Sequence, residues 1–368
     1  MTVKQVLGFT ALLVFITASH ALAGWTVTYL NPTGSTASAA YGGSGSQQVG
    51  YIFSDHHRAS LWSGTAGSCV DLHPSGYGYS RAYASSGGQQ VGYATASGNI
   101  AHAGLWSGTA ESWVDLCPTN RASHALGVSG TKQAGWTSST LGTDIHAALW
   151  SGTAASWVDL NPSWASSSKA LAISGSQEVG YANGSTTAYT NHAGLWTGTA
   201  SSWVDLNPAG SSASMAYGVS GGKQVGYIMV GSILRATLWS GTVMNYTSLN
   251  PAGWANSVAF GISGPWQVGL VRNSSDGSDN HACLWKSSSS AWENLHTYLG
   301  SDYSYSAAQS IGVVDGELWV SGWAYNSTNR MSEAILWHGT DIVPEPSSVL
   351  VLGMALPGLI FALRRRSG

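Results

Sequence analysis

The chain has 368 residues, of which 47 are glycine and only 8% are charged, and its formal net charge is −3. Four of the 14 basic residues and one of the 17 acidic residues lie in the two terminal segments, so the middle region keeps 10 basic and 16 acidic residues, a net charge of about −6. This balance, without a basic patch, argues against nucleic acid as a partner. Three cysteines at unrelated positions argue against a disulfide framework.

Residues 1–23 are expected to form a signal peptide. Lys4 supplies a positive start, residues 6–17 are apolar, and Ala21-Leu22-Ala23 matches the small-residue pattern of a cleavage site before Gly24. A buried helix is the alternative. We therefore expect the protein to be exported.

A motif with a Leu-Trp pair recurs seven times between residues 24 and 342. It is best preserved at residues 102–116, and the spacings between successive tryptophans are 44, 44, 46, 43, 46 and 52 residues. Periods of this size, with tryptophan and glycine at fixed offsets, are typical of propellers and related arrays. The seven tryptophans are Trp62, Trp106, Trp150, Trp196, Trp239, Trp285 and Trp337.

Each repeat is predicted to contain four short strands. Side chains alternate through residues 102–106 and 113–116, and turn residues separate the two runs, which indicates a hairpin with Trp106 facing Trp113. Two strands precede it, one with Ser-x-Ala, as at residues 38–40, and one with Val-Gly-Tyr, as at residues 49–51. Small residues suit the crowded axis of a radial array, and tryptophans suit its rim. The predicted fold is therefore all-β, a seven-bladed β-propeller of four-stranded blades.

The two ends of the repeat region complement each other. The region begins with a strand at residues 27–32 whose Leu-Asn-Pro end matches the end of a fourth strand, and it stops after a third strand at Leu336-Trp337. We expect the N-terminal strand to join the last blade and close the ring, which would hide the open sheet edges. An open array is the alternative, but it would be expected to carry capping repeats, which the sequence does not show.

Residues 343–368 contain three parts in a fixed order: Pro344-Glu345-Pro346, an apolar segment at 349–363, and Arg364-Arg365-Arg366. Such an apolar segment can barely span a bilayer core of about 30 Å at about 1.5 Å per residue. The arginines predict a cytoplasmic end.

The tail resembles the PEP-CTERM sorting signal of Gram-negative bacteria. That resemblance implies a transient transmembrane helix in the inner membrane, recognition and removal by an exosortase, and sorting to the cell surface or to an extracellular, biofilm-type matrix. An ordinary tail anchor is the alternative. The repeats also resemble the HAF-type extracellular repeat, although the triplet here is His-Ala-Gly, His-Ala-Ala or His-Ala-Cys, without phenylalanine.

Histidine and aspartate recur at diagonally related positions of the third and fourth predicted strands, with Gly104 expected to face Asp115 directly. A single pair could be a catalytic dyad. Because the pair recurs, we interpret it as a latch between strands, and a ring of such histidines would be too widely spread to hold one metal ion. The pairs are His102 with Asp115, His146 with Asp159, His192 with Asp205, and Arg58 with Asp71.

No cofactor and no metal are expected. Asp55-His56-His57 could supply metal ligands, but a solvated loop is the favoured interpretation. Residues 276–280 are similar to a calcium loop but lack its closing glutamate. The sequence neighbours that would activate a thiolate are missing at Cys69, Cys117 and Cys283.

Loop lengths predict one variable face, formed by the loops between second and third strands and by the connections between repeats. Binding tends to use the face of an array that tolerates variation. The aromatic residues of this face are candidate ligand contacts. Alternatively, these residues cover the core as lids. They are Tyr77, Tyr79, Trp164, Tyr189, Trp254, Tyr303 and Tyr305.

The preferred function is a non-enzymatic surface or matrix protein that binds a polysaccharide through this variable face, with no catalytic residues. The alternative is a secreted polysaccharide hydrolase or lyase on the same scaffold. Its best candidates are the acidic residues of the aberrant last repeat, which form no recognisable motif: Asp302, Asp315, Glu317 and Glu333.

Overall fold

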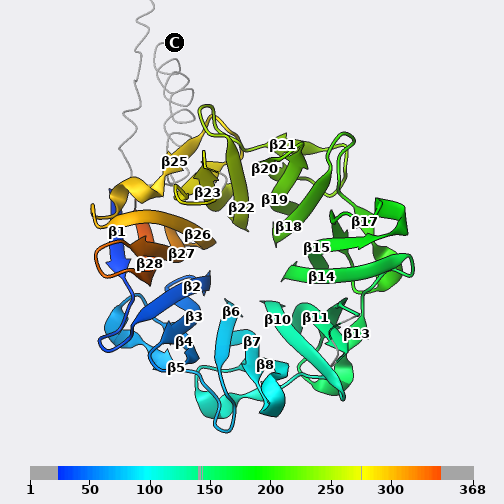
Figure 1. The fold of residues 1–368 in the computed structure, drawn as a ribbon, viewed down its shortest axis with the longest axis horizontal. Coiled ribbons are helices and arrows are strands. Elements are labelled where there is room, and N and C mark those ends of the chain that lie inside the picture. Colours follow the sequence, from blue (N-terminus) through cyan, green and yellow to red (C-terminus); the bar gives the residue numbers. More distant parts are fainter. Residues whose placement is uncertain (1–23, 140–141, 143, 275, 341–368) are drawn as a thin grey trace, which may run out of the picture.

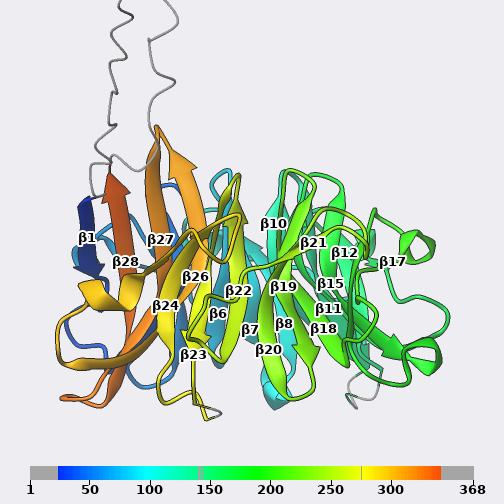
Figure 2. The same ribbon diagram turned by 90° about the horizontal axis from the view of Figure 1, so that it is seen from above.

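The computed structural model describes residues 24–139, 142, 144–274 and 276–340. Within these residues the chain forms seven four-stranded antiparallel sheets, which surround a central axis as blades (Figure 1). Seen from the side, the ring is a disc whose strands run between its two faces (Figure 2). The predicted all-β, seven-bladed propeller is confirmed.

Six blades are continuous in sequence, and in each of them the chain runs from the innermost strand outward. Blade 1 contains β2 (Ala37–Ser44), β3 (Gln47–Phe53), β4 (His57–Trp62) and β5 (Val70–Asp71). Blade 2 contains β6 (Ser80–Ser86), β7 (Gln89–Thr95), β8 (Ala101–Trp106) and β9 (Val114–Asp115). Blade 3 contains β10 (Arg121–Ser129), β11 (Lys132–Ser139), β12 (His146–Trp150) and β13 (Val158–Asp159).

Blade 4 contains β14 (Ala165–Ser174), β15 (Gln177–Gly184), β16 (His192–Trp196) and β17 (Val204–Asp205). Blade 5 contains β18 (Ala213–Ser220), β19 (Lys223–Val230), β20 (Ile233–Trp239) and β21 (Tyr246–Ser248). Blade 6 contains β22 (Asn256–Ser263), β23 (Trp266–Arg272), β24 (His281–Lys286) and β25 (Trp292–Asn294). Short 3₁₀ helices lie in the loops: η1 (Ala66–Ser68), η2 (Ser97–Asn99), η3 (Ala110–Ser112), η4 (Ala154–Ser156), η5 (Ser185–Thr187), η6 (Ala200–Ser202) and η7 (Leu295–Tyr298).

Blade 7 combines the two ends of the described chain. It contains β26 (Tyr303–Val314), β27 (Glu317–Asn326), β28 (Met331–Thr340) and, as its outer strand, β1 (Gly24–Tyr29). β1 pairs antiparallel with β28, from Gly24 opposite Thr340 to Tyr29 opposite Ile335. The N-terminal strand therefore closes the ring, as predicted, and it covers the edge that β28 would otherwise expose.

A buried serine joins each blade to the one before it. The Oγ of Ser80 accepts a hydrogen bond from the backbone N–H of Ala59 at 2.9 Å, and the serine of every other Ser-x-Ala motif makes the same contact. All seven hydroxyls are buried. Because a buried donor without an acceptor costs about 1–3 kcal/mol, this contact explains why the repeat needs serine there.

The tryptophans that end the third strands are the largest side chains of the core, and all seven are fully buried. In blade 2, Trp106 contacts Trp113, with ring centroids 4.6 Å apart, as the sequence predicts. Gly104 makes room for this contact, because a Cβ there would lie 1.8 Å from the Trp113 ring. The rim of the blade is thus built from aromatic packing.

Every innermost strand contains a register shift directly after its Ser-x-Ala motif, which leaves one residue unpaired with the second strand. β14 and β26 contain a second shift near their first residues. A bulge of this kind bends a strand and re-aims a side chain. The seven bulged residues line the central cavity: Tyr41, Tyr83, Leu126, Leu171, Tyr217, Phe260 and Gln309.

Among the described residues, no helix is long and apolar enough to cross a membrane. The predicted signal peptide and the whole of the PEP-CTERM-like tail lie outside the described residues.

Candidate functional site

The recurrent histidine–aspartate pairs form strand-to-strand latches. The His Nδ1 lies 2.7 Å from the Asp Oδ2 in the pairs His102–Asp115 and His146–Asp159, and the third pair has the same geometry at 2.8 Å. The second carboxylate oxygen is also used, since Asp159 Oδ1 accepts the backbone N–H of Asn161 at 2.8 Å. One geometry repeated in three consecutive blades fits a structural latch better than a catalytic dyad, because catalysis needs only one such pair.

One latch has a cysteine beside it. His102, Asp115 and Cys117 place potential metal-ligand atoms within 4.8 Å of one another. However, the same pair forms in blades 3 and 4, where Asn161 and Asn207 replace the cysteine. Burial raises the pKa of the Cys117 thiol to about 11, so the thiol is protonated at neutral pH. The latch geometry therefore needs no metal to explain it.

The other predicted metal-like segments do not converge on a site. His56 Nδ1 contacts Asp55, while the adjacent His57 contacts Arg81 through Nε2 at 3.0 Å. In the segment 276–280, the Asp279 carboxylate accepts the backbone N–H groups of Asn273 and Ser274 and so closes its own loop.

The predicted aromatic contacts are dispersed around the ring. Tyr189 is 70% exposed, whereas three others lie as lids beside the outer strands. Tyr77 packs on Trp113, and its hydroxyl donates to Asp115 at 3.2 Å. Trp164 and Trp254 lie against the tryptophans Trp203 and Trp292. Tyr79 is half-buried beside blade 2, and Tyr305 stacks on Tyr325 at 4.7 Å.

A polar cluster forms where blade 7 departs from the repeat. Glu333 occupies the latch position that is histidine or arginine in the other blades, and this residue is only 8% exposed. Its Oε2 accepts the Tyr303 hydroxyl at 2.5 Å, and its Oε1 accepts Asn329 Nδ2 at 2.8 Å and Asn326 Nδ2 at 3.4 Å. The sequence named Glu333 and Tyr303 separately, and the structure joins them.

The Tyr303 hydroxyl remains a hydrogen-bond donor at neutral pH. Burial and the adjacent Glu333 raise the pKa of Tyr303 far above its usual value. The Tyr303 ring stacks on Tyr29 of the closing strand, with centroids 5.2 Å apart and ring planes 10° apart. The carboxylate of Glu333 is therefore oriented by a tyrosine that is itself fixed in place.

The other acidic candidates of the last repeat divide between the two faces of the disc. Asp302 lies near Glu333, because its Oδ1 accepts the Thr328 hydroxyl at 3.2 Å on the β27–β28 turn that also carries Asn329. Asp315 lies in the β26–β27 turn at the opposite ends of these strands, and Glu317 there pairs with His338 at 2.9 Å. Of these four acids, only Asp302 and Glu333 contact the same turn.

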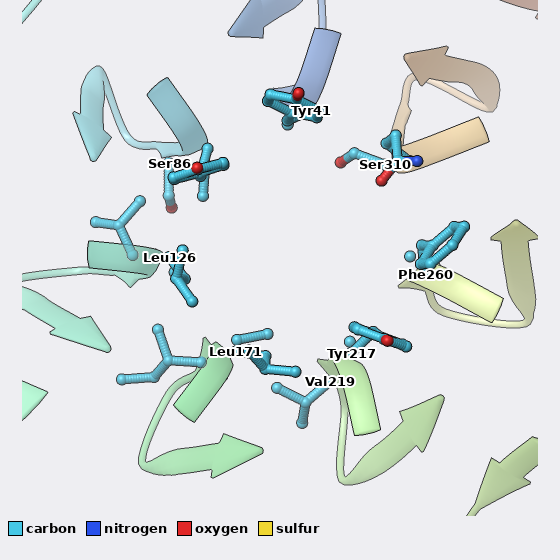
Figure 3. A pocket seen from close by; sticks show the side chains of 18 of the residues that line it. Tyr41, Ser86, Leu126, Leu171, Tyr217, Val219, Phe260 and Ser310 are labelled. Carbon is cyan, nitrogen blue, oxygen red and sulfur yellow. The ribbon is translucent and has the colours of Figure 1, made fainter. Parts of the chain in front are cut away.

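The innermost strands of the propeller line a central cavity of about 630 Å³. Bulged residues such as Tyr41, Leu126, Tyr217 and Phe260 surround its open centre (Figure 3). Burial raises the pKa values of Tyr41 and Tyr83, the latter to about 12, so both hydroxyls are protonated at neutral pH. Sequence reasoning missed this ring, although variation in the residue after Ser-x-Ala was a visible signal.

One sector of the innermost strands is basic and aromatic, and of its residues Arg81 also lines the central cavity. The residue inside the Ser-x-Ala motif is Arg81, His124 or Lys169 in blades 2, 3 and 4. His124 stacks between Tyr93 and Trp136, at centroid distances of 4.2 and 4.4 Å. Burial, with the two neighbouring cations, lowers the pKa of His124 to about 3, so this histidine is neutral. This sector was also missed from the sequence.

The fold and these sites define a closed seven-bladed β-propeller with one aberrant blade. No protein-family model matches the sequence, and no curated protein matches it. Solved propeller structures do match. A puromycin hydrolase S511A mutant complexed with PGG aligns with a TM-score of 0.55 at 10% identity, over 86% of this chain and 57% of that one.

Two further matches show the same scaffold. They are the β-propeller domain of the Trilobed protease from Pyrococcus furiosus (TM-score 0.47, 7% identity, 82% of this chain and 94% of that one) and a Trypanosoma rangeli sialidase (TM-score 0.43, 10% identity, 86% and 59%). The chain spans 57% of the length of the puromycin hydrolase. At these identities the likeness shows the fold alone.

The preferred non-enzymatic function is corrected by these comparisons. The structure that aligns with a TM-score of 0.55 is a puromycin hydrolase, 10% identical to this chain. The hydrolase alternative is therefore better supported. The preference for binding arose because acidic residues are few, but a few carboxylates held in one place suffice for hydrolysis.

Proposed function

We propose that the protein is an exported hydrolase that cleaves a polysaccharide, with Glu333 as its catalytic carboxylate. The observation that carries the proposal is the Glu333 cluster in blade 7. Glu333 is a buried carboxylate that accepts hydrogen bonds from three side chains, and it stands where the other blades have a histidine or an arginine. A buried carboxylate at the point where a repeat changes is a candidate for a function that the repeat does not have.

The geometry suits a general base. Hydrolysis of a glycosidic bond commonly uses a pair of carboxylates on either side of the bond. Glu333 would take the proton of the attacking water, while Tyr303 and Asn329 act as positioning residues that fix the direction of its lone pairs. Asp302, which contacts the same turn as Glu333, is the candidate acid that would protonate the leaving oxygen as the glycosidic bond breaks and water adds to the sugar carbon.

The test is turnover of acidic and neutral polysaccharides by the full chain, measured as the release of reducing ends. Glu333→Gln is expected to lower kcat at least 100-fold, because an amide cannot accept the proton. Tyr303→Phe is expected to lower kcat about tenfold with little change in KM, since it removes only orientation. A product that absorbs as an unsaturated sugar would identify a lyase and contradict the hydrolase.

Glu178→Gln is the matched control for the acid-to-amide change. Glu178 is also buried, but glutamine occupies its position in five other blades. Burial raises the pKa of Glu178, which means that the fold destabilises its charged form, so the uncharged amide should be at least as stable. Unchanged turnover in Glu333→Gln, with a folded protein, would refute the assignment.

We also propose that the chain reaches the cell surface or matrix through its two terminal segments. The support is the signal-like segment 1–23 and the tail with Pro344-Glu345-Pro346, an apolar stretch and Arg364-Arg365-Arg366. An exosortase-type enzyme and, transiently, the inner membrane would be its partners. Intact-mass analysis of the exported protein should show loss of both segments. A mature form that keeps the three arginines would contradict processing.

A further inference from the structure

Arg81 lies on the wall of the central cavity without a carboxylate beside it. Its guanidinium lies 4.7 Å from the centroid of the Tyr51 ring, and its Nη2 hydrogen-bonds His57 Nε2 at 3.0 Å. Elsewhere in the ring, Arg58 and Arg121 form ion pairs with aspartates. In the part of the chain that the structure describes, no ion pair includes Arg81.

The groups around Arg81 are neutral. Tyr41, Tyr51, Tyr83 and Tyr93 all lie close enough to interact with its charge. Burial, followed by the nearby guanidinium, lowers the pKa of His57, so this histidine is an uncharged acceptor at neutral pH. The positive charge of Arg81 is therefore solvated by hydroxyls, aromatic faces and an imidazole, but it is not compensated.

Leaving a half-buried cation without a counter-charge is costly. The Arg81 Nε is buried and has no acceptor among the described residues. The repeat itself does not require a cation there, because the equivalent residues in blades 1, 5, 6 and 7 are Ala39, Met215, Val258 and Ala307. The fold therefore does not explain why a cation without a counter-charge is placed at Arg81.

The basic sector continues into the next two blades. Lys169 places its Nζ 4.7 Å from the centroid of the Trp136 ring, and its charge and that of Arg81 both lower the pKa of His124 between them. Arg81, the neutral His124 and Lys169 thus lie among flat aromatic rings in three consecutive blades, and of these three only Arg81 lines the cavity. The corresponding positions of the other four blades carry uncharged side chains. Aromatic faces beside polar hydrogen-bonding groups suit the binding of a sugar ring.

We propose that the cavity wall around Arg81 binds a carboxylate carried by a sugar ring, with Arg81 as the principal ligand. A guanidinium presents two parallel N–H groups that match the two oxygens of a carboxylate, and the single charge of Arg81 is balanced by a monoanion. The Tyr41 and Tyr83 hydroxyls, also on the cavity wall, can donate to the sugar. This site goes beyond the proposed hydrolysis and does not depend on Glu333.

The experiment is calorimetric titration of the full chain with glucuronate. Glucose serves as the neutral ring, acetate as the carboxylate without a ring, and inorganic phosphate as the other small anion. Glucuronate is expected to bind at least tenfold more tightly than each of the three. Arg81→Met, which introduces the residue found at this position in blade 5, should lower glucuronate affinity at least tenfold.

Lys286→Met is the matched control, because Lys286 is an exposed cation that also lies over an aromatic ring, 4.9 Å from the Trp266 centroid. It should leave glucuronate binding unchanged. The melting temperature of Arg81→Met without ligand should equal or exceed that of the wild type, since the substitution removes an uncompensated charge. Equal glucuronate affinity in wild type and Arg81→Met, or equal binding of glucose and glucuronate, would overturn the proposal.

Discussion

The regular blades and blade 7 obtain their outermost strand in different ways. In blades 1 to 4, the fourth strand pairs through only two residues, as in β9, and a short loop with a 3₁₀ helix tethers it to the third strand. In blade 7 the fourth strand is β1, which pairs with β28 through six residues. In blades 1 to 4, the fourth strand is close in sequence to the third strand with which it pairs. In blade 7, β1 is separated from β28 by about 300 residues, so the pairing of these two strands must offset a larger loss of chain entropy.

The side chains that connect the strands also differ between the regular blades and blade 7. A regular blade adds an exposed His–Asp latch at its rim, while blade 7 buries Glu333 and stacks Tyr29 of β1 on Tyr303 of β26. This contact links the outermost and innermost strands of the sheet. Closure and the candidate active site therefore share residues, which the repeat alone would not reveal.

Deletion of residues 24–32 should have the largest effect on stability. It would remove all of β1 and the fully buried Leu30, and it would expose the edge of β28. We expect a loss of several kcal/mol, because burial of one leucine side chain alone contributes about 2 kcal/mol. Thermal unfolding measures this loss.

A synthetic peptide of residues 24–32, added in trans, should restore part of the melting temperature of the deletion variant. A scrambled peptide of the same composition is its control. An unchanged melting temperature in the deletion would show that the ring does not depend on closure by β1.

Asp159→Asn should have the smallest effect and so sharpen the contrast with Glu333. The His146–Asp159 pair is partly exposed, with 27% and 41% of its side chains accessible, and exposed ion pairs contribute about 0–1 kcal/mol. Blade 6 already contains the variant arrangement, in which His281 faces Asn294 at 3.1 Å. Thermal unfolding should show a loss below about 1 kcal/mol, with turnover unchanged. Loss of turnover would instead give the latch a catalytic role.

Much of the fold could be predicted because the features that build it repeat. Trp106 and Ser123 have counterparts in every blade, and Leu30 matches the ends of other fourth strands, so period and register follow from comparing the chain with itself. Asp115 could likewise be placed opposite Gly104 from strand alternation.

The candidate sites could be predicted only in part, because they depend on residues that do not repeat. Glu333 was visible as an acid, but its contact with Tyr303 required knowledge of how β26 and β28 flank β27. Arg81 and Tyr41 looked like surface or filler residues in a small-residue strand. The bulge that follows the Ser-x-Ala motif is a backbone feature, and no residue type at these positions signals it.

The pairing of β1 with β28 also fixes an order of events during folding. Blades 1 to 6 consist of neighbouring hairpins and can each form as soon as their own residues are available. β1 must wait, because its partner residues, up to Thr340, lie at the far end of the described chain. Long-range pairings of this kind form slowly. Until Thr340 is available, the growing protein has the shape of an open arc with two unpaired edges, and this is the stage at which it is most exposed to aggregation.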